Sequence, residues 1–103
     1  MPVSMQVIYP VSEGSSFDHA YYASKHMELV SEHMGAHIQN TVVTKGLAGG
    51  APDAPAPFHA IATIVFADQS AMDAALAASA PVMADLPNFT NVRPQVLVGE
   101  VIG

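Results

Sequence analysis

The chain has 103 residues, of which half are apolar and only 12% are charged, and its formal net charge is −6. The fixed positive charges are limited to Lys25, Lys45 and Arg93. Three scattered cations cannot neutralise a run of phosphates, which argues against binding to nucleic acid and against docking on an anionic membrane.

The length suits a single domain over 1–103. The sequence contains no cysteine, which excludes disulfides, thiolate metal sites and cysteine nucleophiles. No segment reaches the roughly 18 continuous apolar residues that a membrane-spanning helix needs. The first ten residues lack the basic region and apolar run of a signal peptide. We therefore expect a soluble, cytoplasmic protein.

A strand, a long helix and a second strand are expected in the first half of the chain. Residues 3–9 alternate with a period of two, which predicts a strand. Ser15 and Asp18 have the spacing of a capping box, which predicts a helix over 16–34. Residues 36–45 are rich in β-branched side chains and are expected to form the second strand.

The second half repeats this pattern after a loop. Glycine and proline are frequent over 46–57, which predicts either a lid over a pocket or a plain connector. Residues 58–66 form the clearest strand. Asp68 begins an alanine-rich helix, and Pro81 opens a further short helical turn. Residues 92–102 are expected to form a last strand, whose internal proline indicates an edge position or a bulge.

This order, βαββαβ, is typical of the ferredoxin-like fold. We predict an α+β domain with an antiparallel four-stranded sheet and both helices on one face. In the strand over 58–66, Ala60 and Ala62 point to one face. Ile61 and Val65 point to the other face. A sheet that is apolar on both faces needs two covers, so we predict a homodimer through the face without helices.

Three of the five histidines lie in the first predicted helix, each seven residues after the last. His19, His26 and His33 all fall in the apolar arc of the helix and are expected to face the sheet. Residues seven apart are about 10 Å apart along a helix axis, whereas zinc–nitrogen bonds are about 2 Å long. No two of these imidazoles can share an ion, and no metal site is predicted.

His26 differs from the other two because it is in the middle of the helix. His19 and His33 have ready explanations at the helix ends, where exposure or the helix dipole accounts for them. Tyr22 lies four residues before His26, so both side chains are expected to point into one cavity. The plainer alternative is a neutral, hydrogen-bonded imidazole in the core. Asp18 lies at the margin of the arc and is not expected to continue a relay.

Five motifs extend over nearly the whole chain: VIYP at 7–10, FDHAYYASKHMELV at 17–30, FHAIATIVFAD at 58–68, MADLPNFTN at 83–91 and VLVGEV at 96–101. Together they resemble the EthD family. The resemblance implies a dimeric α/β barrel, in which two ferredoxin-like sheets pack face to face, with a ligand cavity between sheet and helices in each subunit. The family residues carried over are Tyr22, His26, Asp85, Asn88 and Phe89. The family pattern differs at Met27 and Glu28, which affects the expected helix geometry after His26.

The leading functional hypothesis is an enzyme that acts on a small apolar or aromatic molecule in this cavity. His26 is the predicted acid–base group, and Tyr22 is the second predicted catalytic residue. The residues predicted to contact substrate are Tyr9, Phe66, Asp85, Asn88 and Phe89. The resemblance implies an oxidoreductase, a cofactor-free monooxygenase or an isomerase.

Two other functions stay open: a non-catalytic carrier with the same cavity, and a haem protein with a histidine ligand. No cofactor is predicted, because the glycines at 46, 49 and 50 do not form a dinucleotide-binding G-x-G-x-x-G motif.

Overall fold

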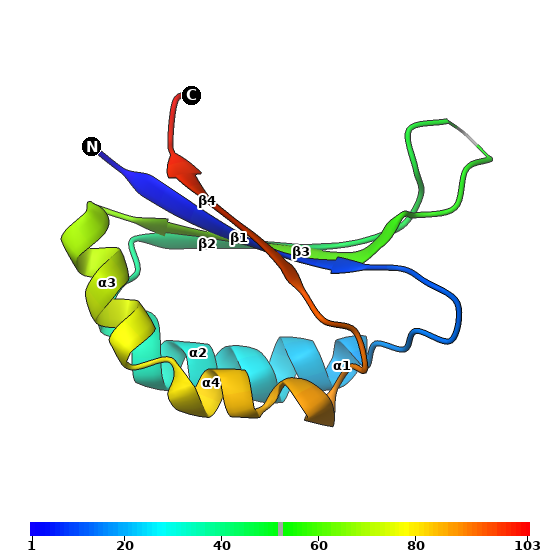
Figure 1. Cartoon of the computed structure of the whole chain (residues 1–103), viewed down its shortest axis with the longest axis horizontal. Helices are drawn as coiled ribbons and strands as arrows, with labels where there is room; N and C mark the ends of the chain where they lie inside the picture. The colour runs from blue at the N-terminus through cyan, green and yellow to red at the C-terminus, as the bar shows by residue number, and fades with distance from the viewer. Residues whose placement is uncertain (52) are drawn as a thin grey trace.

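A four-stranded antiparallel sheet forms one layer of the computed structural model, which describes residues 1–51 and 53–103 (Figure 1). The strands are β1 (Val3–Pro10), β2 (Asn40–Lys45), β3 (Phe58–Phe66) and β4 (Gln95–Glu100). Their spatial order is β2-β3-β1-β4, so the two longest strands are central and β2 and β4 form the edges. The predicted α+β, ferredoxin-like fold is confirmed.

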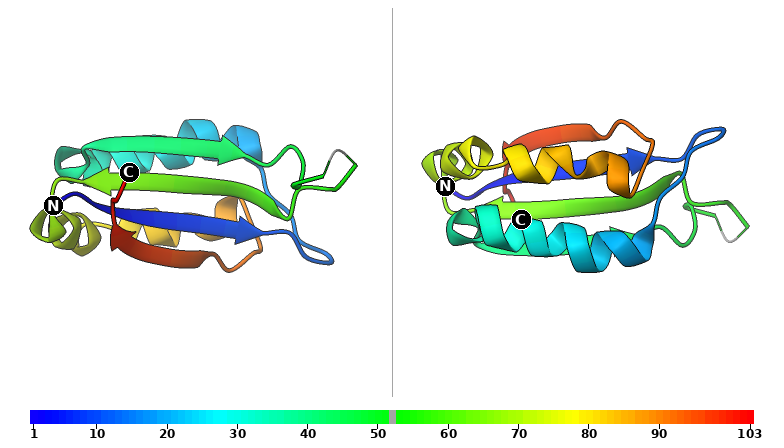
Figure 2. Two further views of the ribbon diagram at one scale, coloured as in Figure 1. Left: turned by 90° about the horizontal axis from the view of Figure 1, so that it is seen from above. Right: turned by 90° about the horizontal axis from the view of Figure 1, so that it is seen from below.

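The second layer consists of helices that all lie on one face of the sheet (Figures 1 and 2). They are α1 (His19–Tyr21), a π-helical segment η1 (Tyr22–His26), α2 (Met27–Met34), α3 (Gln69–Ala77) and α4 (Ala80–Ala84). Short 3-10 turns follow α2 at Gly35–His37 and α4 at Leu86–Asn88. On the opposite face of the sheet, none of the described residues forms a covering helix (Figure 2).

Strand β3 matches its predicted bounds, because its side chains alternate strictly. Ala60, Ala62, Ile64 and Phe66 are buried, and the residues between them are partly exposed. Strand β1 extends one residue beyond its predicted end, to Pro10, whereas the two edge strands are shorter than predicted. Strand β2 starts only at Asn40, after the 3-10 turn, and β4 starts at Gln95, so the proline of the last strand precedes it. The predicted position of this last strand, β4, at the edge of the sheet is confirmed.

The predicted capping box is wrong, and the first helix starts at His19 rather than at residue 16. Asp18 is itself the N-cap, and its carboxylate accepts a hydrogen bond from the backbone N–H of Tyr21 at 3.0 Å. Phe17 is held extended by a β-bridge to Thr90, which leaves no room for an earlier helical turn. Ser15 is part of the preceding turn instead.

Two clusters of buried side chains join the layers. The larger consists of Met5, Val30, Met34, Ile64, Phe66, Met72, Ala75 and Val82. The smaller is aromatic and consists of Tyr9, Tyr22, Ala60 and Phe89. Phe66 is fully buried in the larger cluster, and the burial of one such side chain contributes roughly 1.5–3 kcal/mol.

The face of the sheet without helices is a mixed surface. The strand register places Ile8 beside Ile61 and Gln6 beside both Thr63 and Leu97. Leu97 is 58% exposed on this open face. The open face therefore leaves apolar area in water that a single chain does not cover.

The segment 46–57 includes Pro52, which lies outside the described residues. The rest of the segment rises on the side of the sheet opposite the helices (Figure 1). None of its described residues lines the cavity between sheet and helices, so the structure gives the predicted lid no role there. Within the described ranges, no helix has the length and apolar character needed to cross a membrane.

Candidate ligand-binding and active site

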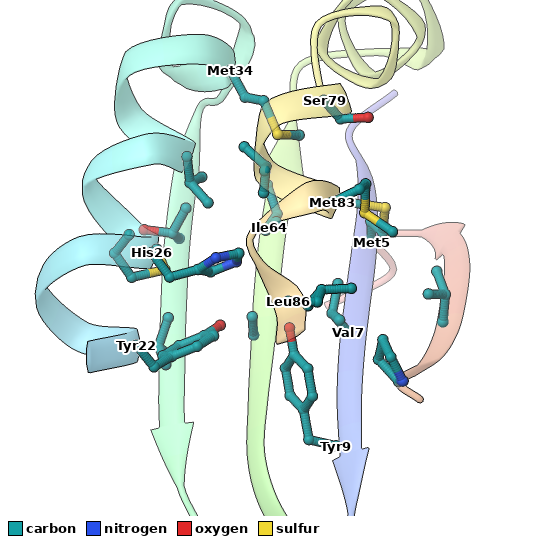
Figure 3. A pocket seen from close by; sticks show the side chains of 18 of the residues that line it. Met5, Val7, Tyr9, Tyr22, His26, Met34, Ile64, Ser79, Met83 and Leu86 are labelled. Atoms are coloured by element: carbon teal, nitrogen blue, oxygen red, sulfur yellow. The ribbon is translucent and has the colours of Figure 1, made fainter. Parts of the chain in front are cut away.

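A cavity of about 260 Å³ lies between the sheet and the helices. The lining side chains, most of them apolar, come from all four strands and from η1, α2, α3 and α4 (Figure 3). They are Met5, Val7, Tyr9, Tyr22, His26, Met27, Val30, Met34, Thr41, Val43, Ala62, Ile64, Leu76, Ser79, Val82, Met83, Leu86, Pro94, Val96 and Val98.

The floor of the cavity follows from the strand register. One row across the sheet runs Val43, Ala62, Val7, Val96, and the next runs Thr41, Ile64, Met5, Val98. The side chains in each row point to the helices, since residues paired across antiparallel strands share a face. The small side chain of Ala62 at the centre of the first row leaves space that a larger residue would fill.

The cavity opens toward the edge strand β4. Met83 on α4 and Val96 on β4 are each 56% exposed although they line the cavity. The opposite end is closed by Tyr9 and Tyr22, which are 2% and 3% exposed. The cavity thus has an apolar mouth and a buried inner end that carries hydroxyl groups.

His26 lies at this inner end and is only 4% exposed. Its Nδ1 is 3.0 Å from Oδ2 of Asp85, which follows α4. Because a carboxylate only accepts hydrogen bonds, Nδ1 carries the proton and the imidazole is the Nδ1–H tautomer when neutral. Nε2 is then a free acceptor on a residue that lines the cavity, and the described residues provide no hydrogen bond to it.

Asp85 is itself held by two further donors. The hydroxyl of Tyr21 donates to its Oδ1 at 2.7 Å, and Nδ2 of Asn88 donates to the same oxygen at 2.9 Å. Burial alone would raise the pKa of Asp85, but the hydrogen bonds from Asn88, Tyr21 and His26 outweigh it, so the pKa lies below its usual value. The carboxylate is therefore charged at neutral pH.

The same pair determines the protonation of His26. Burial lowers its pKa below 6.5, against the opposite effect of the hydrogen bond and charge of Asp85. The imidazole is therefore neutral at pH 7. A neutral imidazole with Nδ1 bonded to a carboxylate and Nε2 open to a cavity has the arrangement of a general base.

The π-helical segment aligns Tyr22 with His26. The N–H of Met27 bonds to the carbonyl of Tyr22, five residues back, which is the π-helical pattern. The rings of Tyr22 and His26 stack with centroids 5.2 Å apart and an angle of 24°. The side chains of the two adjacent tyrosines thus point in different directions. Tyr21 contacts Asp85, and Tyr22 lines the cavity.

The hydroxyls of Tyr9 and Tyr22 point into the inner end of the cavity, on the same side as the imidazole (Figure 3). Burial raises the pKa of Tyr22 to about 12 and raises that of Tyr9 further above its usual range. Both hydroxyls therefore remain protonated at neutral pH.

The residues predicted for the site fall into three groups. Tyr9, Tyr22 and His26 line the cavity. Asp85, Asn88 and Phe89 do not line it; they lie behind His26, where the ring of Phe89 is 4.5 Å from the imidazole.

Phe66 does not line the cavity and belongs to the larger core cluster, so the structure does not bring it to the predicted substrate site. Sequence reasoning missed Tyr21 altogether. Its position beside Tyr22 hides its separate direction, and its partner Asp85 is 64 residues away.

Two of the other histidines, His19 and His59, take part in hydrogen bonds outside the cavity. Nε2 of His19 donates to the backbone oxygen of His59 at 3.0 Å, and Nε2 of His59 is hydrogen-bonded to Oγ of Ser15 at 2.9 Å. His19 and His33 are only partly buried, so the prediction that all three helix histidines face the sheet holds fully for His26 alone. The described part of the chain contains no group of three or more potential ligands placed to hold a metal ion.

Fold and site together define a small α+β protein with a ferredoxin-like sheet, an internal apolar cavity and a histidine–aspartate pair at its inner end. The model of the EthD domain matches residues 14–93, and the chain belongs to the EthD family. An EthD-like protein from Ralstonia eutropha JMP134 is 34% identical and superimposes with a TM-score of 0.90 over 99% of this chain and 93% of its own.

More distant structures share the fold. A dimeric protein of unknown function and ferredoxin-like fold from Bacteroides fragilis is 11% identical, with a TM-score of 0.52 over 97% of this chain and 96% of its own. A cofactor-independent oxygenase from Streptomyces nogalater is 13% identical, with a TM-score of 0.53 over 93% of this chain and 89% of its own. Comparison with curated proteins gives no match.

Proposed function

We propose that the protein is an enzyme that removes a proton from a small, apolar, enolisable molecule held in the cavity, with His26 as the base. One observation carries the proposal: the neutral imidazole is fixed by Asp85 so that its Nε2 faces the cavity. A structural core histidine has no need of an open nitrogen, whereas a general base does.

The proposed step is a proton transfer from a carbon atom of the substrate to His26. A C–H bond next to a carbonyl of the substrate breaks, the proton moves to Nε2 of His26, and the electron pair becomes an enolate. Negative charge develops on the carbonyl oxygen, where the hydroxyls of Tyr9 and Tyr22 donate hydrogen bonds. The charge of Asp85 stabilises the imidazolium that forms. General-base catalysis of this kind contributes about 10²- to 10⁴-fold.

Two reaction outcomes follow from an enolate. If His26 returns the proton to another carbon, the protein is an isomerase. If the enolate donates electrons to dissolved dioxygen, it is a cofactor-independent oxygenase. The shared fold of the oxygenase from Streptomyces nogalater supports the second outcome for a cavity of this architecture.

The size of the cavity limits the ligand. About 260 Å³ is below the range of roughly 300–1,000 Å³ typical of pockets for drug-sized ligands. A molecule of one or two rings suits this space, and the macrocycle of haem does not. Among the described residues, the cavity wall carries no carboxylate and no lysine or arginine, so we expect the part of the ligand inside it to be uncharged.

We infer that the protein works as a homodimer through its open face. The exposed apolar side chains of Val42, at 54%, and Leu97, at 58%, lie on that face and need a cover. The fold shared with the dimeric protein from Bacteroides fragilis supports this arrangement.

Hydrogen exchange into 2-tetralone, an apolar two-ring ketone with acidic C–H bonds, tests the proposed step. In D₂O buffer the protein is expected to accelerate deuterium incorporation next to the carbonyl, measured by mass spectrometry. His26→Gln should remove most of this acceleration. His33→Gln is the matched control, because His33 lies on α2 outside the network and only partly buried.

Binding measured on the same variants separates enzyme from carrier. If 2-tetralone binds to the parent protein but exchanges no faster than in buffer, the chain is a carrier and the base assignment is wrong. Equal acceleration by the parent protein and His26→Gln would also refute it.

A further inference from the structure

A second hollow, the side groove, adjoins the inner end of the cavity at the opposite edge of the sheet from the mouth. It is lined by His19, Tyr22, Ala23, Met27, Val43, Lys45 and Ala60. Tyr22, Met27 and Val43 also line the cavity. The two spaces therefore adjoin each other and share these three side chains as walls.

Lys45 is directed to this groove by the register of the sheet. It pairs with Ala60, which faces the helices and is 2% exposed, so the Lys45 side chain lies on the helix side of β2. Ala60 in turn pairs with Tyr9. The small methyl group of Ala60 therefore lies between Lys45 and Tyr9 in that row.

The charge of Lys45 has no partner in the described residues, where no carboxylate oxygen lies within 4.0 Å of its ammonium nitrogen. This matters in a chain with nine acidic residues against three fixed cations. None of the described residues that line the groove is acidic. His19 lines it as well, but its Nε2 donates to the backbone oxygen of His59. Lys45 therefore supplies the fixed positive charge of the groove.

We propose that the side groove binds a carboxylate, so that the ligand is a small apolar ring compound with an acidic side chain. This inference rests on the proposed function, since it places the ring in the cavity and only the acid at Lys45. The acid belongs in the groove and not beside His26, because the negative charge of Asp85 lies directly behind that imidazole.

Two fluorescent probes that differ in one charge test the proposal. 2-Naphthoate and methyl 2-naphthoate share a fluorescent two-ring frame, and only the first carries a free carboxylate; the chain has no tryptophan to interfere with their emission. Lys45→Met should weaken binding of the anion about fivefold, the order of one partly exposed ion pair. Binding of the neutral probe should be unchanged. Added salt should weaken the binding of the anionic probe and leave the binding of the neutral probe unchanged.

Lys25→Met is the matched control, because Lys25 is exposed on η1 and lines neither the cavity nor the groove. If both lysine variants weaken binding of the anion equally, the loss comes from the change in net charge of the protein, and the inference is wrong. If the neutral probe binds and the anion shows no dependence on Lys45, the groove assignment fails while the proposed function stands. If the neutral probe does not bind, the cavity holds no ligand and both proposals fail.

Discussion

Nδ1 of His26 lies 3.0 Å from Oδ2 of Asp85, and both residues are buried although 59 positions separate them in the chain. The contact joins η1 to the segment after α4 and so links the two halves of the fold. It also determines which imidazole nitrogen faces the cavity. The chemistry proposed for the protein depends on this one hydrogen bond.

Asp85→Asn should therefore remove the preference for the Nδ1–H tautomer. The amide that replaces the carboxylate can accept a hydrogen bond from Nδ1–H, or it can donate one to an unprotonated Nδ1. In the second case the imidazole carries its proton on Nε2, which then faces the cavity as a donor and cannot act as a base. We expect exchange into 2-tetralone to fall about 100-fold and the free energy of unfolding to fall by about 1–3 kcal/mol. Histidine ¹⁵N shifts report the tautomer.

Asp73→Asn is the control for this change, because Asp73 is exposed on α3 and bonds only to Gln69. If Asp85→Asn keeps the parent tautomer and the parent exchange rate, the carboxylate does not orient the base.

The adjacent residues Tyr21 and Tyr22 should give opposite results when each is changed to Phe. Tyr21→Phe removes a donor to Asp85 but leaves the cavity wall intact. We expect a several-fold slower exchange and unchanged affinity for 2-tetralone. Tyr22→Phe removes a hydroxyl from the cavity and should weaken binding of the ketone. Calorimetric titration with the exchange assay measures both; equal effects on affinity would contradict the separate roles.

The pH dependence of exchange follows from the lowered pKa of His26. Only the neutral imidazole accepts a proton, so kcat/KM should rise with pH through a pKa below 6.5 and then stay level. The plateau should continue well into the alkaline range, because the pKa of Tyr22 is about 12 and that of Tyr9 is also raised. A profile that falls between pH 7 and 9 would contradict the assigned groups.

Stability should respond to the same group. The unfolded chain takes up a proton on His26 at a higher pH than the folded chain does. The contribution of His26 is thus present above about pH 6.5 and is lost as the pH falls toward its lowered folded value. Thermal unfolding of the parent protein and His26→Gln across this window measures the difference.

Two neighbouring residues of β4 test the dimer. Leu97 on the open face is 58% exposed, and Val96 on the helix side is 56% exposed. Leu97→Lys should place a charge in the interface and shift the protein to monomer in sedimentation experiments. Val96→Lys has nearly the same starting exposure and should leave the dimer intact. A parent protein that sediments as a monomer at micromolar concentration would refute the predicted interface.

The sequence was most informative where one physical effect dominates. The strict alternation of β3 predicts its bounds correctly, because a central strand buried on one face allows no slip of register. The first helix was predicted three residues too early. Ser15 and Asp18 match the capping pattern, but the bridge between Phe17 and Thr90 is a long-range contact that no local pattern reveals.

The site was predictable only in part for the same reason. The periodicity of the helix and the family resemblance pointed to His26 and Tyr22, and both line the cavity. The hydrogen bonds from Tyr21 on α1 and His26 on η1 to Asp85 depend on where the segment after α4 lies in the folded chain. The π-helical turn that separates the two tyrosines has no recognisable sequence signal.

A crystal structure of the protein with 2-tetralone would show directly whether the cavity beside His26 is the reaction site. We expect the ring between sheet and helices, the carbonyl oxygen at the hydroxyls of Tyr9 and Tyr22, and the neighbouring carbon on the side of Nε2. A ketone bound elsewhere, or an imidazole whose Nε2 is turned to Asp85, would contradict this assignment.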